Sequence, residues 1–367
     1  MLVASTLNFA PPTHAIQSAA HWNSLPRWIC LKRDAAQVVL DTAHRTGFWP
    51  AARRMIPSGL TVLVYHRIAD PNRPDFYGLR DNVSATPNGF AAQLDYLARE
   101  YNVISMGDLT ALVVEGRKLP QRAVLITFDD GYRDNFTTAL PGLVARGMPA
   151  LMFAVPGFLD GYCFPFWDWV VEAIAAAKVE GVMLPLLEQH IAPDSVARQR
   201  QGAEWIDRSK RLPHVELCRA LQGLSRVLEV PSTTPPPPGL MMSWGELNAM
   251  IQGGVALGAH TATHPILLRV GSARAHREIN ISRVKLEARV NARITAFAYP
   301  NGDFSKEHQE MLADAGYKFG FRVDGGLTTV REIARQPFAI RRTCISLNDD
   351  LPRFAAKVAG AERLFRW

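Results

Sequence analysis

The chain is predicted to adopt an α/β fold in which helices cover both faces of a parallel sheet. From residue 60 onward, short apolar runs rich in β-branched residues alternate with segments of helical composition. The runs are almost continuously apolar, which is typical of parallel strands buried on both faces. The composition agrees with a globular protein, since 48% of the 367 residues are hydrophobic and 20% are charged.

The elements follow in order along the chain. Residues 1–58 are expected to form an N-terminal helical appendage, because the stretch 31–54 has helical composition and some amphipathic spacing. Two helices are expected over residues 90–100 and 274–290, and a C-terminal helix within 351–367. Strands are expected at the apolar runs 60–65, 123–128, 150–155, 254–259 and 294–299.

The stretch 160–240 has a different character. It opens with an aromatic cluster around Trp167, continues with helical segments and ends in four prolines at 235–238, which predict a stiff connector. The expected organisation is therefore an α/β domain of residues 59–159 and 241–350, interrupted by a helical insertion over 160–240.

Charge and cysteine patterns exclude several classes of protein. The formal net charge is +7, but the basic residues are scattered, so no nucleic-acid partner is expected. The four cysteines form no Cys-x-x-Cys pair and are expected to be free thiols. No signal-like or membrane-spanning apolar run is seen, so a cytoplasmic location is expected. An arginine-bearing N-terminal segment is compatible with peripheral contact with an anionic membrane; an ordinary packing helix is the alternative.

Two carboxylates end the second expected strand. Asp129, Asp130 and Gly131 follow it directly, and adjacent carboxylates are costly to bury in a packed core. The carboxyl ends of parallel strands carry the active sites of barrels and open α/β sheets. An Asp-Asp-Gly turn without function is the alternative.

Two histidines follow the fourth expected strand. His260 and His264 are four positions apart, a spacing that places both imidazoles on one side of a helical turn. Together with one aspartate of the first motif they form a His₂Asp set, which leaves positions open for water and substrate. Such a set is typical of a catalytic metal site.

These motifs resemble the polysaccharide deacetylase family, the NodB-homology carbohydrate esterases. The residues that carry the resemblance are Thr127-Phe128-Asp129-Asp130-Gly131, His260-Thr261-Ala262-Thr263-His264 and the segment Phe297-Ala298-Tyr299-Pro300-Asn301-Gly302, which is similar to the third motif of the family. The resemblance covers roughly residues 60 to 350. It implies a distorted (β/α)₇ barrel and metal-dependent hydrolysis of the amide bond of N-acetylated sugars.

The resemblance also implies a role for each matching residue. Asp129 would be the general base, and Asp130, His260 and His264 would bind one divalent ion, most often zinc. In the third motif, Tyr299, Pro300 and Asn301 would lie at the substrate, with the backbone N–H of Asn301 in the oxyanion hole.

The third motif departs from the family pattern at two positions. Ala298 stands where many members have an arginine that orients the base, and Asn301 stands where many have a tyrosine. A backbone donor survives the second change. Arg342 is a candidate substitute for the missing arginine.

The expected acid also departs from the commonest pattern. Many members protonate the leaving amine with a C-terminal histidine, but no histidine follows His308 here. His66 ends the first expected strand instead, which resembles the exopolysaccharide deacetylase subgroup with permuted motifs. His66 is therefore a candidate acid, and a histidine capped by a backbone carbonyl is the alternative.

The expected function is metal-dependent removal of N-acetyl groups from amino sugars. The partner would be an N-acetylated surface polysaccharide or its lipid-linked repeat unit. Two alternatives stay open at this point: a deformylase of a lipid-linked amino sugar, and an inactive homologue that binds glycans without turnover.

Overall fold

The computed structural model describes residues 27–55 and 59–361. The expected appendage at 1–26 and 56–58, and the end of the chain at 362–367, lie outside the described residues.

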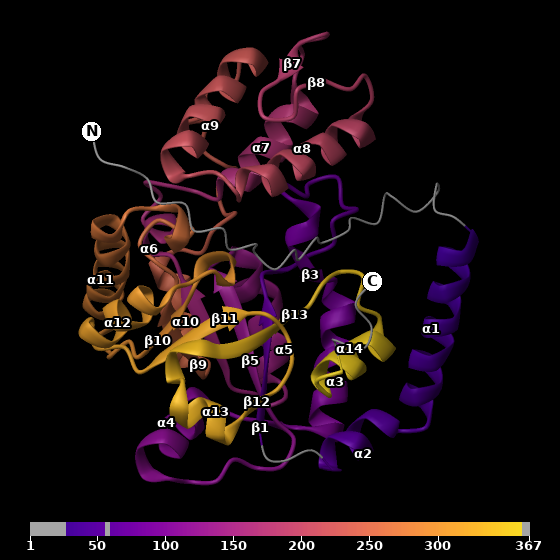
Figure 1. Cartoon of the computed structure of the whole chain (residues 1–367), viewed down its shortest axis with the longest axis vertical. Coiled ribbons are helices and arrows are strands. Elements are labelled where there is room, and N and C mark those ends of the chain that lie inside the picture. The colour runs from indigo at the N-terminus through magenta and orange to yellow at the C-terminus, as the bar shows by residue number, and fades with distance from the viewer. Residues whose placement is uncertain (1–26, 56–58, 362–367) are drawn as a thin grey trace.

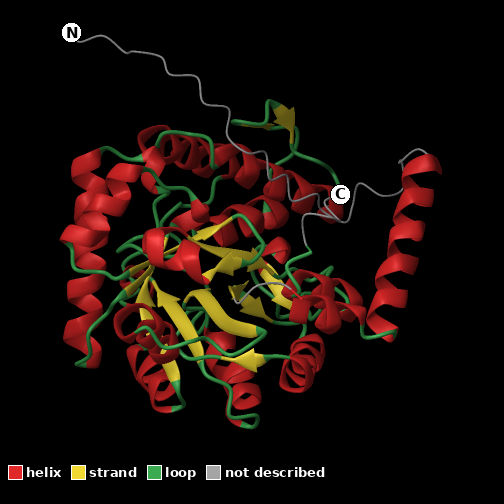
Figure 2. Ribbon diagram, turned by 60° about the horizontal axis from the view of Figure 1, so that its bottom comes forward, coloured by secondary structure: helices red, strands yellow, loops and turns green. Residues whose placement is uncertain are grey.

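Within the described residues, seven parallel strands form a closed barrel ringed by helices (Figures 1 and 2). Each strand pairs with the next one in chain order, and the last pairs with the first. The pairing is uneven: β1 and β5 share six residue pairs, whereas β9 and β10 share one, Ala259 with Phe297. The expected (β/α)₇ barrel is therefore confirmed. Its strands are β1 (Gly59–Tyr65), β5 (Ala123–Asp130), β6 (Ala150–Ala154), β9 (Val255–Ala259), β10 (Ala296–Ala298), β11 (Phe319–Val323) and β13 (Ile340–Cys344).

The strands β11 and β13 are not among the five strands that the sequence predicts. Arg322 interrupts the apolar run of β11, and Arg341 and Arg342 interrupt that of β13, so neither resembles a continuously apolar strand. Shorter strands lie around the barrel: β4 (Asn102–Val103) beside β5, β12 (Thr328–Thr329) antiparallel to β1, and the pair β2 (Arg67–Ile68) and β3 (Val83–Ala85).

Apolar side chains fill both sides of the barrel wall. Phe153 and Phe321 belong to one cluster, with ring centroids 5.2 Å apart, while Val124 and Phe128 belong to a second cluster with the surrounding helices. This double burial explains the apolar runs. The helices are α3 (Pro87–Glu100), α4 (Met106–Glu115), α5 (Leu140–Val144), α6 (Pro156–Leu159), α10 (Trp244–Gln252), α11 (Ser272–Val290), α12 (Lys306–Asp314), α13 (Val330–Arg335) and α14 (Leu351–Val358).

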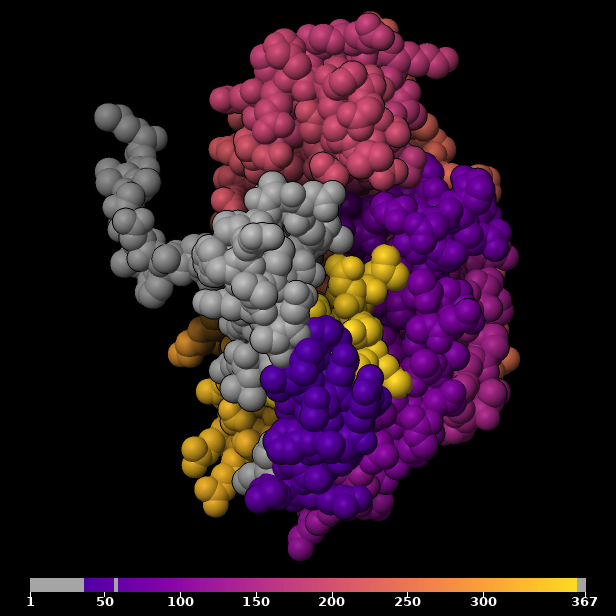
Figure 3. Space-filling model, turned by 90° about the vertical axis from the view of Figure 1, so that its right-hand side faces the viewer, coloured from indigo at the N-terminus to yellow at the C-terminus, as the bar shows by residue number. Residues whose placement is uncertain are grey.

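The residues between α6 and α10 form a lobe at one end of the barrel, seen at the top of Figures 1 and 3. It contains α7 (Phe166–Ala176), α8 (Ser195–Ser209), α9 (His214–Leu228) and the hairpin of β7 (Met183–Leu184) with β8 (Gln189–His190). Trp169 and Trp205 are buried in a cluster of their own there. The limits of this insertion, like the other domain boundaries, stay a prediction.

Two helices precede the barrel, where a single helical stretch was expected. α1 (Arg27–Arg45) and α2 (Phe48–Met55) are separated at Gly47, whose positive φ of 67° ends the first helix. α1 contacts the C-terminal α14, and the Gln37 amide donates to Asp350 at 2.7 Å (indigo against yellow in Figure 3). None of the helices in the described ranges is long and apolar enough to cross a membrane.

Candidate active site

The barrel brings both sequence motifs to one end. Asp129 and Asp130 end β5, and His260 directly follows β9, which is separated from β5 only by β6. One ligand atom from each of Asp130, His260 and His264 lies within 4.8 Å of the other two.

Asp130 is a buried carboxylate aimed at the two imidazoles. Its Oδ1 lies 3.3 Å from Nε2 of His264 and 3.7 Å from Nε2 of His260. Among the described residues this oxygen has no hydrogen-bond partner, although the side chain is almost fully buried. Burial and the neighbouring Asp129 raise the pKa of Asp130 well above its usual range. An orphaned buried oxygen facing two imidazole nitrogens fits a divalent cation, and this donor set suits zinc.

His260 is held in the orientation that a metal ligand needs. Its Nδ1 lies 2.8 Å from the carbonyl oxygen of Ala298, so Nδ1–H donates there and Nε2 is left with a free lone pair. The third motif thus contributes a backbone carbonyl behind the site, a partner that the sequence did not predict.

The segment from His260 to His264 is an irregular loop, so the expected helical turn is wrong. Thr261 and His264 have positive φ values of 64° and 63°, which a helix does not allow. The loop is held by Glu278 of α11, whose carboxylate accepts the N–H groups of Ala262 and Thr263 and the Thr263 hydroxyl at 2.7–3.0 Å.

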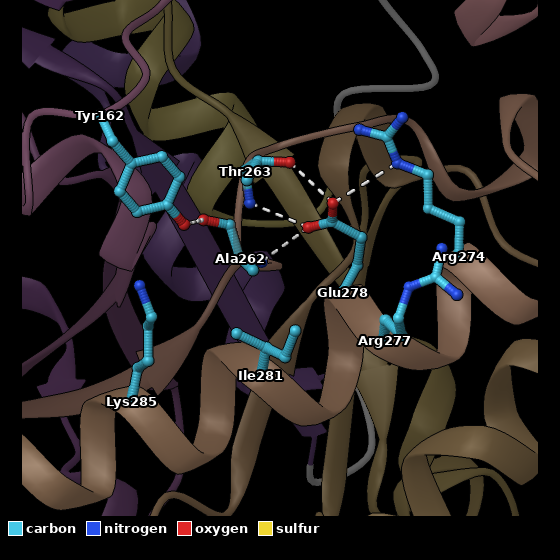
Figure 4. A pocket seen from close by; sticks show the side chains of 8 residues that line it. All are labelled: Tyr162, Ala262, Thr263, Arg274, Arg277, Glu278, Ile281 and Lys285. Carbon is cyan, nitrogen blue, oxygen red and sulfur yellow. Dashed lines mark hydrogen bonds and ion pairs between the residues drawn. The ribbon is translucent and has the colours of Figure 1, made fainter.

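Figure 4 shows Ala262 and Thr263 of this loop beside Glu278. A surface pocket of about 370 Å³ opens there between the loop and α11, lined by Tyr162, Arg277 and Lys285 among others. Glu278 points out of α11 to the loop backbone, so His260 and His264 lie on a segment that is fixed from α11.

Aromatic side chains back His264. The ring of Trp167 meets it edge-on with centroids 4.8 Å apart, and Phe158 stacks on it at 6.0 Å. Trp167 belongs to the aromatic cluster with which the stretch 160–240 opens. The sequence gives no sign of this contact, because Trp167 and His264 are 97 positions apart.

Asp129 has a different partner from Asp130. Arg342 of β13 donates two hydrogen bonds to its carboxylate, of 2.6 and 2.8 Å, and both side chains are buried. Burial alone would raise the pKa of Asp129, but the charge and hydrogen bonds of Arg342, together with His260 and His66, outweigh burial and lower that pKa to about 2. Arg342 therefore lies against the carboxylate of Asp129, and its role in orienting a base stays a prediction.

His66 lies at the same end of the barrel. Its backbone N–H donates to Ser84 at 2.9 Å, and its carbonyl accepts from Asn135 at 2.8 Å. Burial is the main cause that lowers the pKa of its imidazole to about 4, and the nearby charge of Asp129 opposes that shift. The free side chain is therefore neutral at neutral pH.

The third motif contributes less side-chain chemistry than its sequence implies. The Tyr299 hydroxyl donates to the Phe338 carbonyl at 3.0 Å, and its buried ring stacks on Phe304. Pro300 is buried, and Asn301 is exposed with a positive φ of 60° and donates to Asp303. The side chains of Tyr299 and Asn301 are thus hydrogen-bonded to other residues of the chain.

Comparison with known proteins gives relatives of one kind. The chain is 30% identical over 100 residues to YxkH of Bacillus subtilis (strain 168), covering 27% of this chain and 33% of YxkH. It is 23% identical over 316 residues to the poly-beta-1,6-N-acetyl-D-glucosamine N-deacetylase of Escherichia coli (strain K12), covering 82% of this chain and 38% of that protein. The chain therefore spans about a third of the length of these curated relatives.

Solved structures show the same fold. The deacetylase PplD of Streptococcus pyogenes, in complex with acetate, matches with a TM-score of 0.55 at 17% identity and covers 83% of this chain and 99% of its own. IcaB of Ammonifex degensii matches with a TM-score of 0.51 at 19% identity and covers 82% and 97%. The model of the family described as polysaccharide deacetylase matches residues 116–320, more than half of the sequence. This match spans both aspartates and both histidines, and the chain therefore belongs to the polysaccharide deacetylase family.

Proposed function

We propose that this protein removes N-acetyl groups from amino sugars of an exopolysaccharide, with one divalent metal ion held by Asp130, His260 and His264. The observation that carries the proposal is that the two adjacent aspartates have different partners. Asp130 faces the two imidazoles with an orphaned oxygen, while Asp129 is bound by Arg342. A bound divalent cation would supply Lewis acidity, polarising the acyl carbonyl and acidifying water.

Asp129 acts as the general base in this proposal. The pairing with Arg342 keeps its carboxylate ionised and fixes its orientation, so it is ready to accept a proton at any pH near neutrality. The same pairing makes Asp129 a weak base, which would suit a water molecule already acidified by a bound cation.

His66 acts as the group that gives a proton to the leaving amine. Its low pKa of about 4 means that it is neutral before substrate binds. It must therefore take up a proton from solvent within the substrate complex and give that proton to the leaving amine. Asp129 later returns to solvent the proton that it accepted from water, so the protons balance over the cycle. The backbone N–H of Asn301 is the proposed donor to the oxyanion.

The substrate class rests on the family and on the named relatives. One relative is a poly-beta-1,6-N-acetyl-D-glucosamine N-deacetylase, which favours an N-acetylated glucosamine polymer. Assays of acetate release from chito-oligosaccharides, from poly-β-1,6-N-acetylglucosamine and from lipid-linked repeat units separate a polymer substrate from its precursor. Formate release from N-formylated sugars tests the deformylase alternative.

The test of the metal assignment uses protein purified without added metal. Elemental analysis is expected to find one divalent ion per chain, and His264→Ala is expected to lose both the ion and acetate release. Full metal occupancy and activity in His264→Ala would refute the assignment.

The test of the base uses Asp129→Asn. This variant is expected to keep the ion and to lose about 10²–10⁴ in kcat, the usual value of general acid–base catalysis. If the ion is lost as well, Asp129 is a ligand and the two aspartates exchange roles. Binding of oligosaccharide by a metal-loaded wild type without any acetate release would instead support an inactive, glycan-binding homologue.

A further inference from the structure

We infer that helix α7 of the insertion positions two of the metal-ligand candidates, with Tyr132 and Asp168 as positioning residues. This inference rests on the proposed function, because it assigns a role toward the same metal site. One arm runs from Asp168 through Tyr132 and Asn82 to Asp130, and the other places the Trp167 ring against His264.

The first arm centres on the hydroxyl of Tyr132, whose ring is fully buried two positions after Asp130. This hydroxyl accepts from Nε1 of Trp167 at 2.8 Å and from Nδ2 of Asn82 at 3.1 Å. It donates to Oδ2 of Asp168 at 2.8 Å. A phenol has one donor and two acceptor sites, so every site is in use and the geometry of all four groups is fixed.

Asn82 connects this centre to the proposed metal site. Its side-chain amide carries two N–H groups: one donates to the Tyr132 hydroxyl, and hydrogen bonding from this side chain also opposes the raised pKa of the nearby Asp130 carboxyl. The Tyr132 hydroxyl therefore fixes the rotation of the Asn82 amide, which in turn holds one face of Asp130. The remaining Oδ1 of Asp130 is free to point at the two imidazoles.

Asp168, the first residue of this arm, is held in place by a second hydrogen bond besides that from Tyr132. It is fully buried, and its Oδ1 accepts the backbone N–H of Leu79 at 2.8 Å. An asparagine at 168 cannot replace it, because Leu79 and Tyr132 donate to different carboxylate oxygens, and an amide nitrogen in either place cannot accept a hydrogen bond.

The second arm uses the neighbouring residue of the same helix turn. Trp167 gives its Nε1–H to Tyr132 and its ring edge to His264, so a single side chain connects the two arms. Outer-shell partners of metal ligands typically change metal affinity 10- to 100-fold when they are removed. The insertion is therefore part of the metal site and not a separate module attached to the barrel.

The experiment measures zinc affinity of the full chain by competition with a chromophoric chelator. Tyr132→Phe removes one oxygen without changing charge, and a 10- to 100-fold weaker affinity is expected. Asp168→Asn should show a loss in the same direction, and it serves as the second variant if Tyr132→Phe does not fold. Tyr317→Phe is the matched control, since it deletes another buried hydroxyl, one bonded to the Ile279 carbonyl at 3.1 Å. It should bind zinc within about twofold of wild type.

A double-mutant cycle separates positioning from a general loss of structure. If Tyr132 acts through Asn82, the losses caused by Tyr132→Phe and Asn82→Ala should not add, and the double variant should resemble the more severe single variant. Additive losses, unchanged affinity in Tyr132→Phe, or an equal loss in Tyr317→Phe would overturn the inference. A wild type that binds no zinc or other divalent ion would overturn the proposed metal function itself, which is a distinguishable result.

Discussion

Two adjacent aspartates in one strand have opposite electrostatic environments. Against the effect of burial, Arg342 with His260 and His66 lowers the pKa of Asp129 to about 2, whereas burial and Asp129 itself raise the pKa of Asp130 well above its usual range. Separated pKa values in a pair of carboxyl groups are typical of sites where the two have different roles. At the scale of single residues, Arg342 on β13 is the main group that lowers the pKa of Asp129.

Replacing Arg342 should therefore change the pH dependence of the reaction. In Arg342→Leu the counter-charge is gone and burial remains, so the pKa of Asp129 rises and the carboxylate is protonated at a higher pH. The acidic limb of the plot of kcat/KM against pH should move to higher pH. At neutral pH, kcat/KM should fall by up to about 100-fold, because Asp129 is no longer held in its orientation. Leaving a buried charge unpaired should also cost about 3–5 kcal/mol of unfolding free energy.

The neighbouring arginine gives the control for that experiment. Arg341 lies on the same strand but pairs with Asp324 at 3.1 Å in a partly exposed position. Arg341→Leu should leave the acidic limb where it is in wild type. An unmoved limb in Arg342→Leu, or an equal movement in Arg341→Leu, would show that Asp129 is not the group that sets the limb.

The role of His66 can be tested by the choice of leaving group. An amine needs a proton as the C–N bond breaks, but the phenolate of an activated acetate ester does not. His66→Ala should thus cut turnover of N-acetylated sugars by about 10²–10⁴ and slow ester hydrolysis far less. Equal losses on both substrates would make His66 a positional group, and another proton donor would have to be sought.

At the scale of elements, the loop between the two histidines depends on a single carboxylate of α11. Glu278 satisfies two loop N–H groups and one hydroxyl. Glu278→Ala should release this loop and weaken metal affinity about 10- to 100-fold, since His264 loses its fixed position. Titration of the metal-free variant with zinc provides the measurement.

A second glutamate of α11 offers a control of the same kind. Glu287 accepts the Ile294 N–H at 2.9 Å and pairs with Arg283, away from the histidine loop. Glu287→Ala should lower stability without changing metal affinity. If the two variants bind zinc equally well, the loop keeps its shape without Glu278.

The expected elements and the expected site depended on different signals in the sequence. Apolar runs predicted five barrel strands, because burial on both faces leaves a clear pattern, and the arginines of β11 and β13 concealed the other two. Arg342 was nevertheless singled out through the family pattern, as a replacement for a residue that the third motif lacks. The partnership of Trp167, Tyr132 and Asp168 had no local signal, since it joins residues 35 and 36 positions apart through side-chain geometry alone.

At the scale of the whole molecule, metal binding should appear as added stability. A ligand that binds only the native state stabilises it by about 2.7 kcal/mol at 100 times its Kd. Zinc should therefore raise the melting temperature of the metal-free protein, and a chelator should reverse the change. His264→Ala is the control, and it should melt at the same temperature with and without zinc. A similar shift in both proteins would indicate that zinc binds elsewhere.

The closure of the barrel has a consequence for how the protein is made. β1 pairs with β13, and the pair of Arg342 with Asp129 joins positions 213 residues apart. During synthesis, β5 emerges long before β13, so the nascent barrel must carry the Asp129 carboxyl without its counter-ion. A buried unpaired carboxylate is strongly unfavourable, so the half-built sheet should stay loosely packed until β13 docks. The pair of Arg342 with Asp129, the proposed base, should therefore form late in folding, when β13 closes the barrel.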